Sequence, residues 1–118
     1  MISIEVDKYL DEDTREAILS IVSGTVHLVV FSFPYNGKHL ADTMTLYALF
    51  ATDLCREEYA APVKIEGNFF GYHIVGEVVS IKPPIVSIED IHIVLDAKIP
   101  GDIQTGEMLG FNVSRLDY

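Results

Sequence analysis

Four histidines and one cysteine are the side chains of this chain with the widest chemical range. None of the histidines belongs to a His-x-x-x-His or His-Glu-x-x-His pair; they are His27, His39, His73 and His92. Cys55, the only cysteine, completes no Cys-x-x-Cys motif, and a zinc site needs several such ligands at defined spacings. The acids Asp11, Glu12 and Asp13 lack the alternating Asp/Asn pattern and the glycine of a calcium loop. The sequence therefore predicts no metal site and no bound cofactor.

Groups that could perform covalent or acid–base catalysis are equally dispersed. No Gly-x-Ser-x-Gly elbow is present, and no glycine-rich loop precedes a helix. The adjacent acids Glu57-Glu58 and Glu89-Asp90 would point to opposite faces of a strand, so neither pair would converge on one substrate. Cys55 is expected to be a buried, structural side chain. No catalytic residue is assigned, and the sequence leans against an enzyme.

Aromatic and histidine side chains beside predicted loops form the first candidate binding set. Tyr35 stands in the turn-forming segment 34–38, and Tyr72 and His73 follow the aromatic pair at 69–70. Such residues combine apolar area with a polar atom, which suits recognition of a partner. The same aromatic side chains could instead plug the end of a barrel, and both interpretations stay open.

Charge indicates a second candidate surface. The chain has 18 acidic and 8 basic residues, a net charge of −10. Nucleic acids and anionic membranes attract clustered Lys and Arg, and here the basic residues are spread singly, so neither is an expected partner. The densest acids lie between positions 5 and 16, where Asp11, Glu12 and Asp13 occupy a predicted turn. They would attract a basic protein partner, or they would simply keep the protein soluble.

Length and cysteine usage bound the organisation of the chain. A length of 118 residues corresponds to one domain, covering residues 1–118. A single cysteine cannot form an intrachain disulfide, and acids at Glu5 and Asp7 interrupt any apolar leader. No run approaches the roughly 18 apolar residues that would cross a bilayer. We therefore expect a cytoplasmic protein with no membrane partner.

Apolar residues alternate with polar ones through much of the chain, as in half-buried strands. The first alternation covers residues 2–7, and three later apolar runs cover residues 74–81, 85–95 and 108–116. Pro83-Pro84 and a Gly- and Asp-containing turn region separate these runs. Strands at about ten-residue spacing predict a mainly β, antiparallel barrel of five to six strands.

Two segments each allow two interpretations. Residues 17–33 could form two strands joined at Ser23-Gly24 or one long strand bent at Gly24. We favour the bent strand, since Ser-Gly is not a preferred hairpin pair. Residues 39–61 fit a helix capped by Asp42, but also a strand from Thr43 to Thr52. We favour the strand, and an α+β fold with a helix at about 40–60 is the alternative.

Long bent strands with glycine corners resemble the OB-fold barrel. The resemblance covers most of the chain and rests on strand spacing and on glycines such as Gly24 and Gly76. It carries no family motif, so it assigns no functional residue. The barrels of that fold bind oligonucleotides, oligosaccharides and proteins.

The acidic charge and the lack of a recognisable set of catalytic residues together favour a binding function over an enzymatic one. We expect a non-enzymatic protein-interaction module, such as an inhibitor, an immunity-type protein or an assembly protein. Its partner would be a basic protein or a second copy of the chain, docked through the β-barrel surface. The alternative is a small-molecule or carbohydrate binder that uses a groove of the barrel.

Overall fold

The computed structural model describes residues 1–118 and consists of twelve strands without a helix. The strands are β1 (Ile2–Asp11), β2 (Glu16–Ser23), β3 (Val26–Ser32), β4 (Leu40–Ala41), β5 (Met44–Leu49), β6 (Thr52–Arg56), β7 (Ala61–Lys64), β8 (Tyr72–Ser80), β9 (Ile85–Ile88), β10 (Ile91–Val94), β11 (Met108–Val113) and β12 (Arg115–Asp117). The mainly β prediction is confirmed. The helix alternative for residues 40–60 is wrong, because β4, β5 and β6 occupy that segment.

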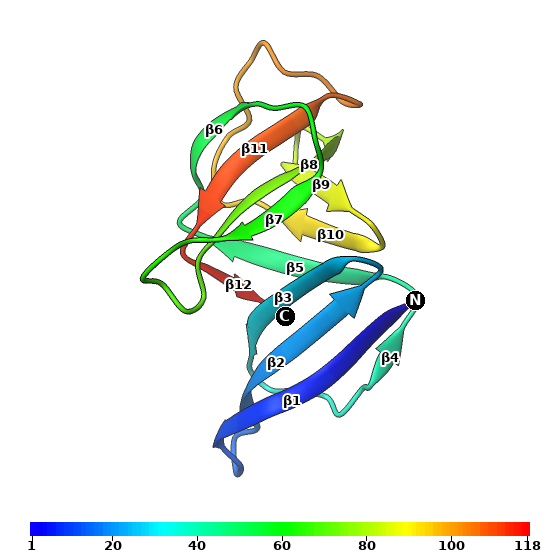
Figure 1. Ribbon diagram of the computed structural model, residues 1–118, viewed down its shortest axis with the longest axis vertical. Helices are drawn as coiled ribbons and strands as arrows, with labels where there is room; N and C mark the ends of the chain where they lie inside the picture. The colour runs from blue at the N-terminus through cyan, green and yellow to red at the C-terminus, as the bar shows by residue number, and fades with distance from the viewer.

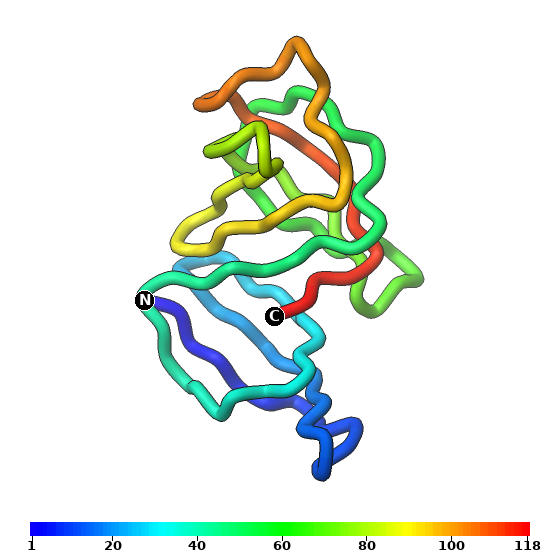
Figure 2. Tube along the Cα trace, turned by 180° about the vertical axis from the view of Figure 1, so that it is seen from behind, coloured from blue at the N-terminus to red at the C-terminus, as the bar shows by residue number.

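The strands form one sheet in the order β4-β1-β2-β3-β12-β5-β10-β9-β8-β11-β6, with β7 paired to β8. Figure 1 shows β1–β4 grouped at one end and β6–β11 at the other, with β5 and β12 between them. The view from behind shows the same division, with the C-terminus at the boundary between the groups (Figure 2). Most neighbours are antiparallel, but β10–β5 and β12–β3 are parallel. The molecule measures 45 × 29 × 24 Å.

The sheet is open and has twelve strands, so the predicted closed barrel of five to six strands is wrong. Several runs expected as single strands are interrupted. Glu89-Asp90 turns the run 85–95 into the hairpin β9–β10, and Phe50-Ala51 separates β5 from β6. Glu89 and Phe50 both have positive φ, a conformation that ends a regular strand. Apolar alternation does not show such breaks, because the inward side chains continue on both sides of them.

Residues 95–107 connect β10 to β11 and contact both ends of β6, the last strand of the sheet (Figure 1). The Asp96 carboxylate accepts the N–H groups of Phe50 and Ala51 at 2.7 and 2.8 Å, just before β6. At the other end of β6, Arg56 Nη2 donates to the carbonyl of Asp102 at 2.9 Å. Ile99 within this connection is buried in the core. This connection therefore packs beside β6 where no further strand is paired.

The core follows the alternation that the sequence predicts. Twenty-eight buried residues form one cluster. The inward residues at the start of β1 are buried, as are those of β10 and β11; they are Ile2, Ile4, Ile91, Ile93, Leu109, Phe111 and Val113. Val6, the next inward residue of β1, is only partly buried. His92 and Asp96 are exposed, as expected. The structure contains no helix long and apolar enough to cross a bilayer.

The bent strand favoured for residues 17–33 is wrong, because β2 and β3 form a tight hairpin. Ser23 pairs with Val26, so the two loop residues are Gly24 and Thr25 rather than Ser23 and Gly24. Gly24 has a φ of +58°, and a glycine at the first loop position is typical of a type II′ turn. The loop therefore lies one residue later than the Ser23-Gly24 pair, and a glycine is favoured at its first position.

Candidate functional site

Tyr35, predicted as a binding residue, lies in the core. Its side chain is 2% exposed, and its hydroxyl donates to the carbonyl of Lys38 at 2.6 Å. Burial raises the pKa of Tyr35, with a further contribution from Tyr9. Arg15 Nε donates to the carbonyl of Tyr35 at 2.8 Å, and the Arg15 guanidinium lies over the Tyr35 and Tyr9 rings. Tyr35 thus closes the end of the β1–β3 layer and is not presented to a partner.

Tyr72 is also buried and links the two groups of strands. Its hydroxyl oxygen accepts the N–H of Val29 on β3 at 3.0 Å, and its side chain belongs to the core cluster. Burial raises the pKa of Tyr72, and the Val29 hydrogen bond acts in the opposite direction. Lys64 Nζ lies 4.8 Å from the centre of its ring and also bonds to the carbonyl of Phe69. Burial lowers the pKa of Lys64.

The acids Asp11, Glu12 and Asp13 occupy the exposed tip of the β1–β2 hairpin, at the lower end of Figure 1. Asp11 Oδ1 accepts the N–H groups of Asp13 at 2.9 Å and Thr14 at 3.3 Å, which fixes the turn. The tip belongs to the β1–β4 group of strands, whereas His73 lies on β8 in the other group. The structure therefore does not combine the predicted residues into one site.

His73 is the predicted residue that takes part in a polar network. Its Nδ1 lies 2.7 Å from Asn112 Oδ1, and its Nε2 lies 2.6 Å from Glu57 Oε1. Asn112 Nδ2 in turn donates to Asp53 Oδ2 at 3.0 Å. The four side chains Glu57, His73, Asn112 and Asp53, which we call the His73 network, connect β8, β11 and the β6 region. About a third of the His73 and Glu57 side chains is exposed.

The hydrogen bonds of the His73 network form one chain. Asn112 Nδ2 donates to Asp53, so the Asn112 oxygen faces His73 Nδ1, and the other ring nitrogen, Nε2, faces the Glu57 carboxylate. His73 therefore lies between an amide oxygen and a carboxylate oxygen, with one of them at each ring nitrogen.

Strand register brings the His73 network together. His73 and Asn112 are direct partners in the β8–β11 ladder, and Gly110 is the partner of Cys55 in the β11–β6 ladder. Glu57 lies over Gly110, and a Cβ added at Gly110 would fall on the Glu57 carboxylate. Only a glycine at this position leaves Glu57 a path across β11 to His73 on the next strand.

Cys55 is exposed on β6, so the expectation of a buried structural thiol is wrong. Its Sγ lies 3.8 Å from Glu57 Oε1. Desolvation raises the pKa of the Cys55 thiol, and the neighbouring Glu57 carboxylate raises it further. A thiol that resists ionisation is a poor nucleophile. The His73 network consequently does not activate the sulfur beside it.

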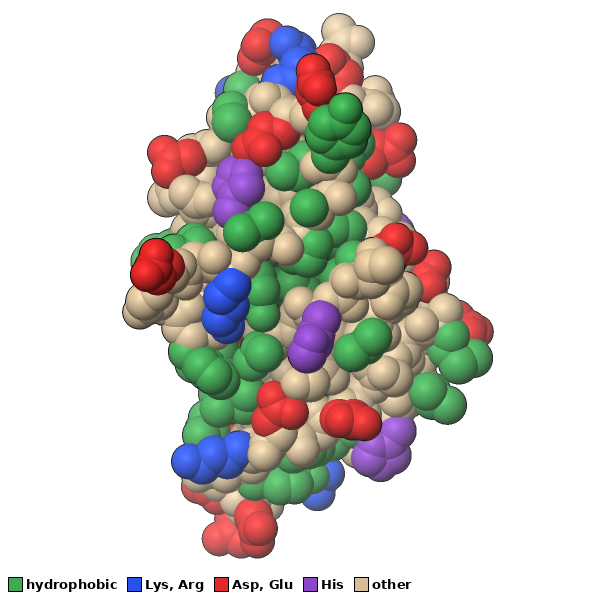
Figure 3. Space-filling model, viewed as in Figure 1, with side chains coloured by type: hydrophobic (Ala, Val, Ile, Leu, Met, Phe, Trp, Pro, Cys, Tyr) green, Lys and Arg blue, Asp and Glu red, His purple; other side chains and the backbone are tan.

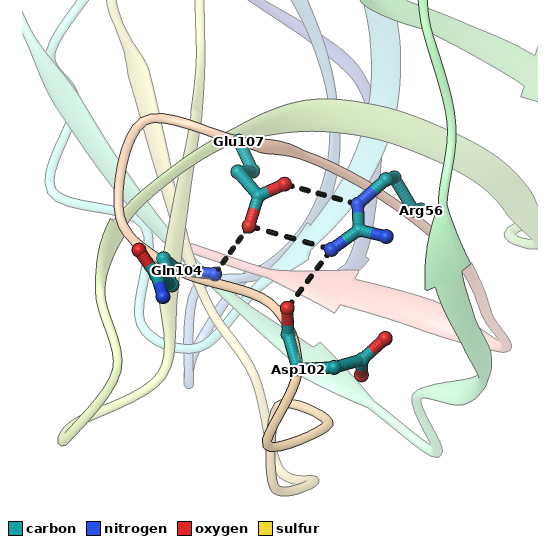
Figure 4. Close-up of polar contacts among 4 residues, drawn as sticks. All are labelled: Arg56, Asp102, Gln104 and Glu107. Atoms are coloured by element: carbon teal, nitrogen blue, oxygen red, sulfur yellow. Dashed lines mark hydrogen bonds and ion pairs between the residues drawn. The ribbon is translucent and has the colours of Figure 1, made fainter.

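A second polar cluster joins β6 to the 95–107 connection (Figure 4). Arg56 Nε pairs with Glu107 Oε2 at 3.0 Å, and the Gln104 N–H donates to Glu107 Oε1 at 2.9 Å. The Gln104 hydrogen bond, followed by that from Arg56, lowers the pKa of Glu107. Both oxygens of the Glu107 carboxylate are paired within the chain, and the geometry of the cluster explains how the connection is held in place.

No three His, Cys, Asp or Glu side chains converge so as to hold a metal ion. The one cavity, about 200 Å³, lies beside β4 and is lined by Met1, Lys38, Leu40, Ala41 and Asp42. It does not adjoin the His73 network. No family model, curated protein or solved structure matches the chain.

His73 was among the residues predicted from the sequence, but the other three members of the His73 network were not. Alternation could have placed His73 on the outer face of its strand, because Tyr72 and Ile74 on either side are buried. Glu57, Asn112 and Asp53 stand 16 to 59 residues from their partners in the network. No local pattern reports such pairings, because they depend on which strands become neighbours.

Proposed function

We propose that the protein is a non-enzymatic interaction module that docks on a basic protein partner. The observation that carries the proposal is the β1–β2 hairpin, whose acids make no ion pair. Four ion pairs occur in the whole chain, and they use Asp90, Glu107, Glu57 and Asp117. None of the acids between positions 5 and 16 takes part.

The two basic residues of the hairpin do not neutralise its tip. Arg15 is directed at the carbonyl of Tyr35 and at the hydroxyl of Tyr9, and Lys8 forms no ion pair. Figure 3 shows acidic side chains spread over this face from end to end, with fewer Lys and Arg side chains among them. A concentrated, unneutralised negative field attracts a basic surface over about a Debye length, roughly 8 Å at physiological salt.

Association kinetics test this proposal. The variant D11N/E12Q/D13N removes three charges from the tip and retains an acceptor oxygen at each position. Because exposed charges act mainly on encounter, its association rate with a basic protein should fall about tenfold at low salt. The dissociation rate and the thermal stability should barely change.

A matched control removes three charges elsewhere. D42N/E66Q/E77Q alters exposed acids outside the hairpin and should leave the association rate within about twofold. An equal loss in both variants would mean that net charge alone acts, as the solubility interpretation holds. An unchanged rate in the hairpin variant would contradict the proposal.

The alternative functions have less support. A groove for a small molecule or carbohydrate would typically have a volume of about 300–1,000 Å³, and the cavity beside β4 is about 200 Å³. Self-association must overcome repulsion between two copies that each carry a charge of −10. A basic protein is instead attracted by the charge of −10, so we propose a basic partner. An inhibitor or an immunity-type protein would bind its target in this way.

A further inference from the structure

The outer edge of β1 has a long segment without backbone partners. β1 pairs with β2 along its length, but β4 pairs only with Ile2 and Ser3. The last backbone bond on this side joins the Ile4 N–H to the carbonyl of His39 at 2.8 Å. Beyond it, no main-chain group on this edge of residues 5–11 makes a hydrogen bond. An unpaired strand edge is a template for another strand.

The direction of the free backbone groups follows from the β1–β2 ladder. In an antiparallel pair, alternate residues direct both main-chain groups toward the partner strand and the others direct them away. Ile4 points away from β2, because its N–H bonds to His39 on the other side. Val6, two residues on with no bulge between them, points the same way. Its N–H and C=O therefore form no hydrogen bond within the chain and point to the side of β1 along which the β3–β4 connection passes (Figure 1).

The side chains along this edge define what it would accept. Glu5, Asp7 and Asp11 are exposed, and Lys8 is the single base among them. Leu10 is 47% exposed, so the edge also presents apolar area. A strand of opposite charge, with apolar residues between its basic ones, would complement both features.

We propose that this free edge of β1 binds an extended basic segment of the partner as an added strand. The inference rests on the proposed function, since it supposes that the partner is a basic protein. Main-chain groups of the segment pair with β1 from Val6 onward, and Lys or Arg at alternate positions face Glu5, Asp7 and Asp11. Residues 6–10 span about 17 Å, at roughly 3.4 Å per residue, so the segment needs about five residues.

The edge also disfavours a second copy of this chain. Two copies would place carboxylates opposite carboxylates, which destabilises cross-strand pairs. β1 carries irregularities at Asp7 and at Leu10, where the register with β2 shifts. Bulges and edge charges are devices by which proteins prevent edge-to-edge self-association. A basic strand would not be repelled by the carboxylates of β1. A short strand would also need to follow only a short part of the bent edge.

Peptides that differ only in their backbone test the inference. The probe is a capped seven-residue peptide of alternating Lys and Val, and the matched probe carries N-methyl groups at alternate residues. N-methylation keeps the charge and the side chains but removes N–H donors. We expect the methylated peptide to bind at least tenfold more weakly in calorimetry at low salt. Hydrogen exchange at the Val6 amide should slow at least tenfold with the unmethylated peptide, while exchange at the unpaired loop amide of Gly67 should not.

The outcomes separate this inference from the proposed function. Equal, salt-sensitive binding of both peptides, with no protection of Val6, would overturn strand addition and leave charge-driven docking intact. No binding of either peptide, together with an unchanged association rate of the hairpin variant toward a basic protein, would overturn both. Concentration-dependent dimerisation that protects Val6 without any peptide would identify a second copy as the occupant and contradict the basic partner.

Discussion

Asp96 holds the corner at which β5 becomes β6, and its removal should destabilise the protein. Its two oxygens accept the N–H groups of Phe50 and Ala51 at 2.7 and 2.8 Å. Phe50 has a φ of +57°, which for a residue other than glycine costs about 1–2 kcal/mol. The carboxylate therefore stabilises a backbone conformation that the local sequence disfavours.

The structure gives the magnitude. Hydrogen bonds to a charged group contribute about 1.5–3 kcal/mol each, and the exposure of Asp96 lowers this to about 1 kcal/mol per bond. Asp96→Ala should then cost about 2 kcal/mol. An unfolding entropy of about 250 cal/mol/K for this length converts the loss to a fall in Tm of about 8 °C. Asp96→Asn keeps one acceptor and should lose about half as much.

Equilibrium unfolding in urea and thermal melts followed by circular dichroism measure these losses. Asp102→Ala is the matched control, because Asp102 lies in the same connection and its carboxylate makes no hydrogen bond. It should change stability by less than about 0.5 kcal/mol. If Asp96→Ala is no more destabilising than Asp102→Ala, the corner does not depend on the carboxylate and this reasoning fails.

Two further substitutions test the polar clusters. Gly110→Ala should cost about 0.5–1 kcal/mol, because its methyl group would push the flexible end of Glu57 off β11 and break its contact with His73, whereas Gly101→Ala, with open space around it, should be nearly neutral in the same urea titration. Glu107 has a folded-state pKa below its unfolded value of about 4.3, so its contribution is present above that pH and is lost as pH falls through the folded pKa. Glu107→Gln should therefore lose stability at pH 7 and show a shallower decline below about pH 4.3; a decline as steep as that of the unaltered protein would contradict this.

The amino-acid sequence determined the β class, the inward residues of each strand and the charge. These properties are local: a period of two identifies a half-buried strand wherever its partner lies. The alternation accordingly predicted the buried side chains Ile2 and Ile4 in β1 and Leu109, Phe111 and Val113 in β11. The turn at Asp11–Asp13 was equally visible, since a dense run of charge cannot enter a core.

Only the tertiary structure decided where strands break, how they pair and which side chains meet. Phe50 and Glu89 adopt positive φ because hairpin and corner geometry demands it, although neither residue type favours that conformation. Tyr35 and Tyr72 are buried because their hydroxyls find backbone partners at Lys38 and Val29. Without those partners an aromatic residue beside a loop could equally lie on the surface.

The His73 network shows the physical reason for this division. His73 meets Asn112 because β8 and β11 align in one register, and a shift of one residue would turn one of them to the opposite face. Glu57 reaches His73 because the residue between them on β11 is Gly110. The free energy that selects this register is distributed over the pairing of entire strands and the packing beneath them. It is absent from any short stretch of sequence, so the chain specifies the His73 network only once it has folded.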